Sequence, residues 1–260
     1  MRTRIATAAA LLLLAGCDAT NAAGPNSTGA PTASSATPTS AKQGAEASSP
    51  YRSPVPAAPL ATAAHGYTAT AITTPTTQPG RVITTPQVRG GDAAVTARFN
   101  AAMQASVAGI RTLTGAAVVN DGGLDGGYRS GVTRIGSGAV AGRVVLYWDG
   151  GGAHPNLSLG TVVIDTRTAQ PVTVDDLYRD RATALERLRT LLPELDITGR
   201  LTHQRLSSDA LADDWLPTPA GLEIYVSVPH VIGDYVPVTV PWNRISDLLK
   251  PGVETMLRAD

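Results

Sequence analysis

Two histidines in loop-like surroundings are the clearest chemical groups of the sequence. His154 follows three glycines and precedes Pro155, so the backbone there is tight and the imidazole is expected at a strand end. Asp149 lies five residues earlier and is a candidate acidic partner. The pattern allows a general base or a metal ligand, because imidazole titrates near neutral pH. The alternative is a histidine whose ring nitrogens bond nearby backbone and fix the turn.

A second loop holds Pro229, His230 and Gly233, where surface recognition is favoured over catalysis. The sequence has no His-x-His or His-Glu-x-x-His pair, so a zinc hydrolase would lack its usual helix-borne ligands. We therefore predict no catalytic residue, no metal and no cofactor, and name His154, Pro155, Pro229, His230 and Gly233 as ligand-binding candidates.

Composition excludes several classes of protein. The formal net charge is zero and charged residues make up 16% of the chain, so an electrostatic nucleic-acid binder is excluded. One cysteine, Cys17, cannot form an internal disulfide or a multi-cysteine zinc site.

The N-terminus is typical of an export signal. Two arginines precede about eleven apolar residues, a stretch too short to cross a bilayer. Its end, Leu14-Ala15-Gly16-Cys17, resembles the lipobox of bacterial lipoproteins, in which the peptide is cut before the cysteine and acyl chains such as palmitate are attached to it. The resemblance implies a signal peptide over residues 1–17 and anchoring by membrane lipid at the outer face of the cell membrane. An ordinary signal peptide with a chance cysteine is the alternative.

Residues 18–64 are predicted to be a disordered tether. Of these 47 residues, 39 are Ala, Ser, Thr, Pro, Gly or Asn, which cannot bury enough apolar surface to offset the entropy of ordering. A glycosylated stalk has the same composition.

Residues 65–260 are predicted to form one folded domain. Strands are expected over 66–72 and 82–88, followed by a helix capped by Asp92. Its buried stripe repeats at spacings of three and four: Val95, Phe99, Met103, Val107 and Ile110. The glycine-rich stretch 120–131 is predicted to be a loop.

The second half alternates strands and helices. Strands are expected over 143–148, 158–165, 222–228 and 236–240, the last at a sheet edge because it contains Pro237. A helix capped by Asp175 or Asp180 should end at Pro193, and a short helix should cover 245–249. The prediction is an α+β fold, a mostly antiparallel sheet packed on one long and one or two shorter helices.

Several segments in order resemble the C-terminal extracytoplasmic domain of RsiV-type anti-sigma factors, also found in a secreted mycobacterial immunogenic-protein family. They are the segments 151–155, 163–165, 171–178, 215–225, 229–233 and 240–242. The resemblance covers residues 132–250 and, more faintly, the strand–strand–helix unit over 65–118.

The resemblance implies a sheet wrapped on a long helix with hairpin loops at one end, and through those loops the binding of a lysozyme-like protein. The chain departs from the family at Ala169, where glycine is usual, and at His230, where many members carry tyrosine. A left-handed backbone would make Ala169 cost about 1 kcal/mol.

The expected function is that of a lipid-anchored extracytoplasmic binding module for a lysozyme-like protein or a cell-wall glycan such as peptidoglycan, without catalysis. The alternative is a wall-glycan hydrolase or esterase that uses His154 with an acidic partner. Trp148, Trp215 and Trp242 could stack on sugars, although Trp148 and Trp215 are favoured as core residues.

Overall fold

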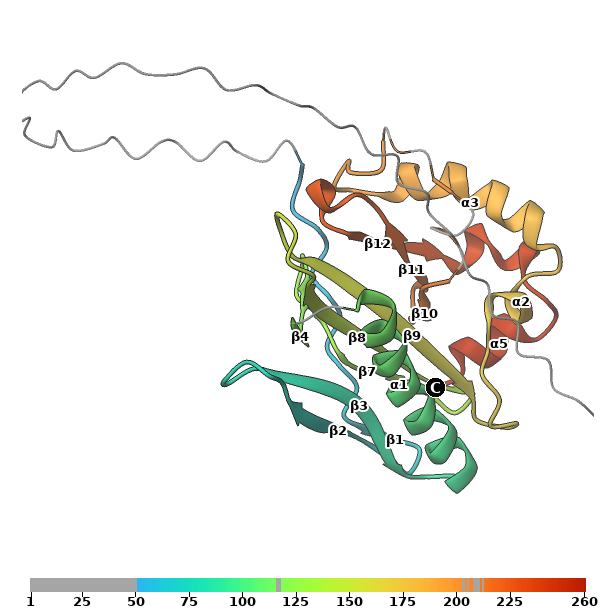
Figure 1. The fold of residues 1–260 in the computed structure, drawn as a ribbon. Helices are drawn as coiled ribbons and strands as arrows, with labels where there is room; N and C mark the ends of the chain where they lie inside the picture. Colours follow the sequence, from blue (N-terminus) through green and yellow to red (C-terminus); the bar gives the residue numbers. More distant parts are fainter. Residues whose placement is uncertain (1–50, 116–117, 203, 205, 208–210, 212) are drawn as a thin grey trace, which may run out of the picture. The chain divides into compact units, whose positions relative to one another are not determined.

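The computed structural model describes residues 51–260 except 116–117, 203, 205, 208–210 and 212. Cys17, the export signal and residues 18–50 of the predicted tether lie outside the described residues. The fold is α+β with antiparallel strand pairing, as predicted (Figure 1). Its strands are β1 (Ala63–Ala64), β2 (Tyr67–Pro75), β3 (Val82–Gly90), β4 (Val118–Asp121), β5 (Gly123–Leu124), β6 (Tyr128–Arg129), β7 (Gly131–Ile135), β8 (Ala139–Asp149), β9 (Asn156–Asp165), β10 (Trp215–Pro217), β11 (Gly221–Ser227) and β12 (Tyr235–Pro241). Its helices are α1 (Ala93–Thr114), α2 (Val174–Leu177), α3 (Arg181–Leu195) and α5 (Val253–Arg258), with 3₁₀ turns η1 (His230–Ile232), η2 (Trp242–Arg244) and η3 (Ser246–Leu248).

Strand β8 is the centre of the fold. It pairs with β9 along its whole length on one side, and with β7 and then β4 on the other. Side chains alternate between the two faces of a strand, and both faces of β8 are covered. Val140 and Val144 enter one hydrophobic cluster, whereas Ala141 and Val145 enter the other. The sequence of β8 is therefore apolar without alternation, as expected of a strand buried on both faces.

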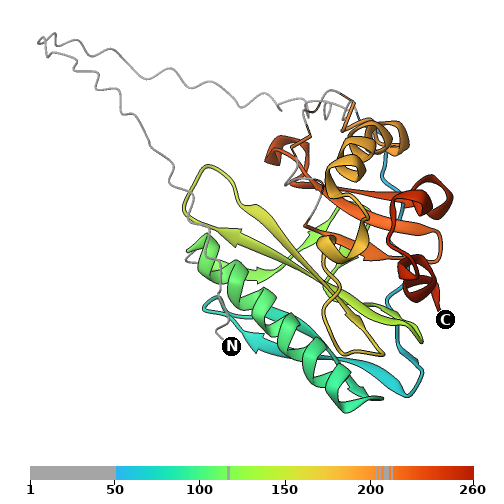
Figure 2. The same cartoon turned by 90° about the vertical axis from the view of Figure 1, so that its right-hand side faces the viewer.

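Helix α1 and the β2–β3 hairpin cover one face of this sheet (Figures 1 and 2). The Asp92 side chain accepts hydrogen bonds from the backbone N–H groups of Ala94 (2.9 Å) and Val95 (3.0 Å), which confirms the predicted cap. The predicted stripe is also confirmed, because the buried residues of α1 are Val95, Phe99, Met103, Val107 and Ile110.

Helix α3 and the β10–β12 sheet cover the other face. Asp180 caps α3 by accepting from the backbone N–H of Thr183 (2.7 Å), so it is the second of the two predicted caps that forms. The predicted end at Pro193 is wrong, because α3 continues to Leu195. Strand β12 lies at the sheet edge, as Pro237 predicted.

Apolar and polar residues alternate along β11, which would suit a strand with one face in solvent, but the strand is buried on both faces. Leu222, Ile224 and Val226 enter the same cluster as the leucines of α3. Glu223 and Tyr225 alternate with them and meet Arg143 of β8 instead, where the Arg143 Nη1 donates to the Tyr225 hydroxyl (3.0 Å) and that hydroxyl donates to Glu223. The polar half of the pattern thus faces a second sheet rather than solvent.

Residues 51–64, which composition assigns to the tether, run along the domain as an extended strap. The N–H groups of Arg52, Ala57 and Ala61 donate to the carbonyls of Thr198 (3.1 Å), Gly126 (2.8 Å) and Val132 (2.9 Å), respectively. The strap then enters β1, which pairs with β2. Besides these backbone hydrogen bonds, Leu60 lies against Gly131, and the Arg200 guanidinium lies 5.7 Å from the centre of the Tyr51 ring. Such isolated contacts leave no periodic hydrophobic pattern in the sequence.

Two further predictions are corrected. The stretch 120–131 contains the end of β4 and the β5–β6 hairpin rather than a plain loop, because its glycines alternate with the buried residues Leu124 and Tyr128. The helix expected over 245–249 is a 3₁₀ turn, and the last helix is α5, which begins after Gly252.

Ala169 has a left-handed backbone, with φ of 55°. Because the Cβ of an L-residue is strained there, Ala169→Gly is expected to raise the free energy of unfolding by about 1 kcal/mol, or Tm by roughly 2–4 °C. Thermal unfolding followed by circular dichroism measures this. Ala153→Gly, in an exposed bend without a positive φ, is the matched control and should not stabilise. A lower Tm for Ala169→Gly would contradict the prediction.

Asp214 gives the domain a predicted pH dependence. Loss of water around its carboxyl group raises the pKa of Asp214 to about 7, and the neighbouring Asp213 carboxylate adds to the shift. The fold therefore favours the protonated carboxyl group of Asp214. The stability that depends on this protonation is fully present below about pH 4 and is lost as the pH rises through 7. Asp214→Asn should stabilise the protein by about 1–2 kcal/mol at pH 8.5 and change little at pH 4. Urea unfolding at both pH values tests this, with the exposed Asp247→Asn as control; equal effects of Asp214→Asn at the two pH values would contradict it.

Candidate functional site

Two loops that lie far apart in the sequence meet at one end of the central sheet. One is the β8–β9 connection over residues 150–155, and the other is the β11–β12 connection over residues 228–234; together we call them the paired loops. The imidazole rings of His154 and His230 stack with centroids 4.0 Å apart and an interplanar angle of 6°. The structure thus brings the two predicted histidines into direct contact.

His230 has an acidic partner that orients its ring. Its Nδ1 lies 3.0 Å and 3.2 Å from the two carboxylate oxygens of Asp234. A carboxylate accepts hydrogen bonds, so Nδ1 carries the proton and donates, and Nε2 remains available as an acceptor in the neutral ring. Asp234 is 8% exposed and also accepts from the backbone N–H of Leu157 (3.2 Å), which ties the second loop to β9.

His154 lacks the acidic partner that the sequence suggested. Asp149 accepts from the backbone N–H of Gly151 (2.8 Å) and so fixes the turn. The His154 ring is exposed, and its hydrogen-bond contact among the described residues is a 3.4 Å approach of Nδ1 to the Pro155 carbonyl. The acid–histidine pair of this site is therefore His230 with Asp234.

The other three predicted residues shape the same loops. Pro229 precedes η1, and Gly233 follows it with φ of 118°, a conformation that favours glycine. The Gly233 N–H donates to the His230 carbonyl (2.8 Å) and closes the turn. Pro155 directly precedes β9. All five predicted ligand-binding candidates thus belong to one surface.

A cavity of about 580 Å³ opens beside the paired loops, and we call it the Asn120 cavity. Four parts of the chain line it: the β2–β3 turn, the β4–β5 link, strand β8, and the paired loops with the start of β9. Its lining residues are Gln78, Arg81, Asn120, Asp121, Gly122, Gly123, Tyr147, Pro155, Asn156, Leu157, His230 and Asp234. This volume lies within the range of small-molecule sites.

A row of three side chains forms the base of this cavity. Asn120 of β4 is paired with Tyr147 of β8, which is paired with Leu157 of β9, so the three lie on one face of the sheet. Asn120 is 5% exposed as a whole residue, but its amide is not among the buried polar groups without a partner. No described residue hydrogen-bonds to this amide, and it lines the cavity, so water or a molecule in the cavity can reach it.

Gly122 is required where the chain crosses the base of the cavity. A Cβ at this position would lie 2.8 Å from both the Leu157 side chain and the backbone nitrogen of Tyr147, inside van der Waals contact. The Gly122 N–H donates to the Val145 carbonyl (3.0 Å), which holds the β4–β5 link against β8. The floor of the cavity is therefore built by close backbone packing.

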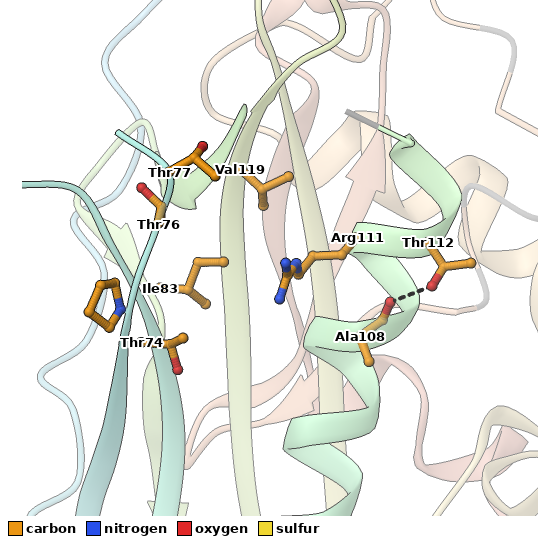
Figure 3. A pocket seen from close by; sticks show the side chains of 9 residues that line it. Thr74, Thr76, Thr77, Ile83, Ala108, Arg111, Thr112 and Val119 are labelled. Atoms are coloured by element: carbon orange, nitrogen blue, oxygen red, sulfur yellow. Dashed lines mark hydrogen bonds between the residues drawn. The ribbon is translucent and has the colours of Figure 1, made fainter. Parts of the chain in front are cut away.

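A second, slightly larger cavity of about 630 Å³ lies between the β2–β3 hairpin and the C-terminal half of α1 (Figure 3). Arg111 points from α1 into it, toward Ile83 of β3, and Thr74, Thr76 and Thr77 line the hairpin side. Thr112 donates to the Ala108 carbonyl of its own helix (2.9 Å). This cavity contains none of the sequence-predicted site residues, and its polar residues are mostly exposed hydroxyls.

The tryptophans lie mostly in the interior of the domain. Trp215 and Trp242 are buried and Trp148 is half-buried. Within the described part of the chain, no group of three or more His, Cys, Asp or Glu side chains is arranged to hold a metal ion. Nor does any helix in that part have the length and apolar character needed to cross a membrane.

Asp234 and Asn120 line the cavity and were not among the sequence-predicted site residues. Asp234 follows His230 by four residues and could have been found by that spacing. Asn120 carries no local signal, because its role depends on its register with Tyr147 across two strands.

Comparison with known proteins gives structural neighbours only. No protein-family model matches the sequence, and no curated protein matches it. The structure is similar to a DUF3298 family protein from Pseudomonas aeruginosa PAO1, with a TM-score of 0.45 and 15% identity over 78% of this chain and 98% of the other. It is also similar to a DUF3298 family member from Bacteroides fragilis NCTC 9343, with a TM-score of 0.44 and 14% identity over 74% and 96% of the two chains.

Proposed function

We propose that this chain is a lipid-anchored extracytoplasmic binding module that recognises a lysozyme-like protein or a cell-wall glycan through the paired loops and the Asn120 cavity. The observation that carries the proposal is the meeting of the two loops, which stacks His154 on His230 beside a polar cavity. Loops held by a rigid sheet are the usual place for binding residues. The Asp234 carboxylate fixes this loop geometry before any ligand arrives.

The anchor is tested separately from the ligand. Cys17 is the single cysteine and ends the lipobox-like segment, so the full chain produced in bacteria should partition into detergent with the membrane fraction. Cys17→Ser should move it into the aqueous fraction. Equal partitioning of the two chains would contradict lipidation without bearing on the ligand.

The ligand is tested by retention of the purified full chain on immobilised lysozyme and on immobilised cell-wall glycan. Retention on one of them is expected, and His154→Ala with His230→Ala should weaken it at least tenfold. His65→Ala is the matched control, because His65 lies in the β1–β2 turn outside the paired loops. Failure of both supports to retain the protein, or an equal effect of the His65 control, would contradict the proposal.

A hydrolase or esterase is the second candidate, favoured specifically by the His230–Asp234 pair. A histidine whose Nδ1–H is held by a carboxylate has Nε2 free to take a proton from water, as a general base does. For this candidate the general base is His230, with Asp234 as its acidic partner. The sequence had suggested His154 as the base. Asp234→Asn should then lower turnover of a glycan substrate about 10²-fold or more while retention on the glycan persists. Unchanged turnover would eliminate this candidate.

A further inference from the structure

We infer that docking of the strap orders the second of the paired loops, residues 228–234, so that the start of the strap regulates the shape of the candidate site. The connection runs through the Arg200 side chain, which contacts the strap, the β5–β6 hairpin and the second paired loop. The coupling itself depends on no ligand, whereas its consequence for ligand binding rests on the function proposed above.

The strap begins on the turn that follows α3. The Arg52 N–H donates to the Thr198 carbonyl (3.1 Å), and the Arg200 guanidinium lies over the Tyr51 ring, 5.7 Å from its centre. A cation at this distance from an aromatic ring is attracted to the face of the ring. The turn is fixed on the domain side, because the Asp196 carboxylate accepts from the N–H (2.8 Å) and the hydroxyl (2.6 Å) of Thr198. Strap docking therefore adds a contact to the guanidinium rather than building the turn.

The guanidinium has one further partner, on the β5–β6 hairpin. Nη2 of Arg200 donates to the Asp125 carboxylate (2.5 Å), whereas Nε is buried without a hydrogen-bond partner among the described residues. The strap supports this side as well, since the Ala57 N–H donates to the carbonyl of Gly126, the neighbour of Asp125 (2.8 Å). Residues 51–57 thus hold both members of the Arg200–Asp125 ion pair.

The ion pair lies against the second paired loop. A Cβ at Gly233 would lie 3.2 Å from Nη1 of Arg200 and 3.9 Å from the Asp125 carboxylate, so both side chains pack on the Gly233 backbone. Gly233 is the residue on which this loop turns: its N–H donates to the His230 carbonyl (2.8 Å), and its carbonyl accepts from the Tyr235 N–H (2.7 Å). The position of the ion pair therefore limits the movement of the loop.

These contacts define two states of the site. With the strap docked, the Arg200 side chain is 12% exposed and is held between Tyr51, Asp125 and the Gly233 backbone. With residues 51–57 released, the guanidinium loses its aromatic partner, and an ion pair open to water holds its geometry weakly. The Gly233 backbone then loses its support. Because coupling between two sites is reciprocal, a ligand that orders the paired loops should also favour the docked strap.

The test is hydrogen exchange of the full chain, followed by mass spectrometry, in a variant whose strap start is released. Tyr51→Ala with Arg52→Pro removes the aromatic ring and the N–H that donates to Thr198. Exchange of the amides over residues 228–234 should become about fivefold faster or more, the lower end of couplings between sites in proteins. Exchange over β9 should stay unchanged, because the contacts of that strand with β8 are untouched.

Two single variants test the route of the coupling. Arg200→Gln keeps the strap sequence intact and should speed exchange over residues 228–234 to a similar extent. Arg258→Gln is the matched control, because it breaks the exposed ion pair with Glu254 in α5 and should leave this loop unchanged. Unchanged exchange of the loop in either the strap variant or Arg200→Gln would overturn the inference, and so would an equal rise over β9 or in the Arg258 control.

The coupling and the proposed function fail in different ways, because the exchange measurement needs no ligand. If exchange rises as expected but neither lysozyme nor wall glycan retains the chain, the coupling stands and the binding function is wrong. If a support retains the chain through the paired loops but exchange does not change, the binding function stands and the coupling is wrong.

Discussion

Replacing Glu223 by glutamine is expected to lower the free energy of unfolding by about 3–5 kcal/mol, the loss typical of a buried charge deprived of its partner. Arg143 and Glu223 are 4% and 7% exposed and face each other between the central sheet and β11. The Tyr225 hydroxyl connects them, because it accepts from Arg143 and donates to Glu223. With glutamine, the Arg143 charge would stay buried without a counter-charge. Urea unfolding monitored by fluorescence measures the change.

A double substitution separates lost charge pairing from lost packing. Arg143→Met with Glu223→Gln removes both charges and should restore at least half of the stability lost in the single variant. Tyr225→Phe, which keeps the ring and its edge-to-face contact with Tyr128, should cost less than Glu223→Gln. The prediction is contradicted if the double variant is no more stable than Glu223→Gln alone.

Removal of the strap is expected to be the second large effect. A chain that begins at residue 65 should be about 2–4 kcal/mol less stable than one that begins at residue 48, with a Tm lower by roughly 5–15 °C. The shorter chain lacks the backbone hydrogen bonds to Thr198, Gly126 and Val132, and the pairing of β1 with β2. Ala57 also leaves one hydrophobic cluster, and Ala61 and Ala64 leave the other. Differential scanning calorimetry of the two chains measures the difference.

Gly126→Ala provides the control for the strap. A Cβ at Gly126 would lie 2.7 Å from the Val55 carbonyl oxygen of the strap, and the residue has φ of 82°. The substitution should therefore cost more in the chain from residue 48, where it disturbs both strap and turn, than in the chain from residue 65. Equal costs in the two chains, or equal Tm values for the unsubstituted pair, would show that the strap does not stabilise the domain.

Local patterns explain which elements could be predicted. The stripe of α1 and the caps at Asp92 and Asp180 depend on residues within one or two turns, so they were predicted correctly. The alternating pattern of β11 correctly predicts a strand. It does not predict what the polar side chains contact, because Arg143 lies about 80 residues away in the sequence. The strap leaves no local signal for a related reason, since its hydrogen bonds go to the distant residues Thr198, Gly126 and Val132.

The candidate site also has parts that local sequence predicts and parts that depend on long-range contacts. The two histidine loops were recognised by their own glycine, proline and histidine residues, and the structure places them together. Their acidic partner was assigned to the wrong histidine, because loop geometry turns Asp149 toward Gly151 and Asp234 toward His230. Asn120 lies beside Tyr147 because of the register in which β4 pairs with β8. The sequence contains no turn signal that would specify this register.

The strap also determines how the domain bears mechanical load. A pull on the chain before Tyr51 reaches the hydrogen bond between Arg52 and Thr198 first, then those at Ala57 and Ala61, and reaches β2 last. These bonds are separated along the strap, so they break one after another rather than together. Extension of the strap therefore lengthens the connection to the domain in steps before the pull reaches β2.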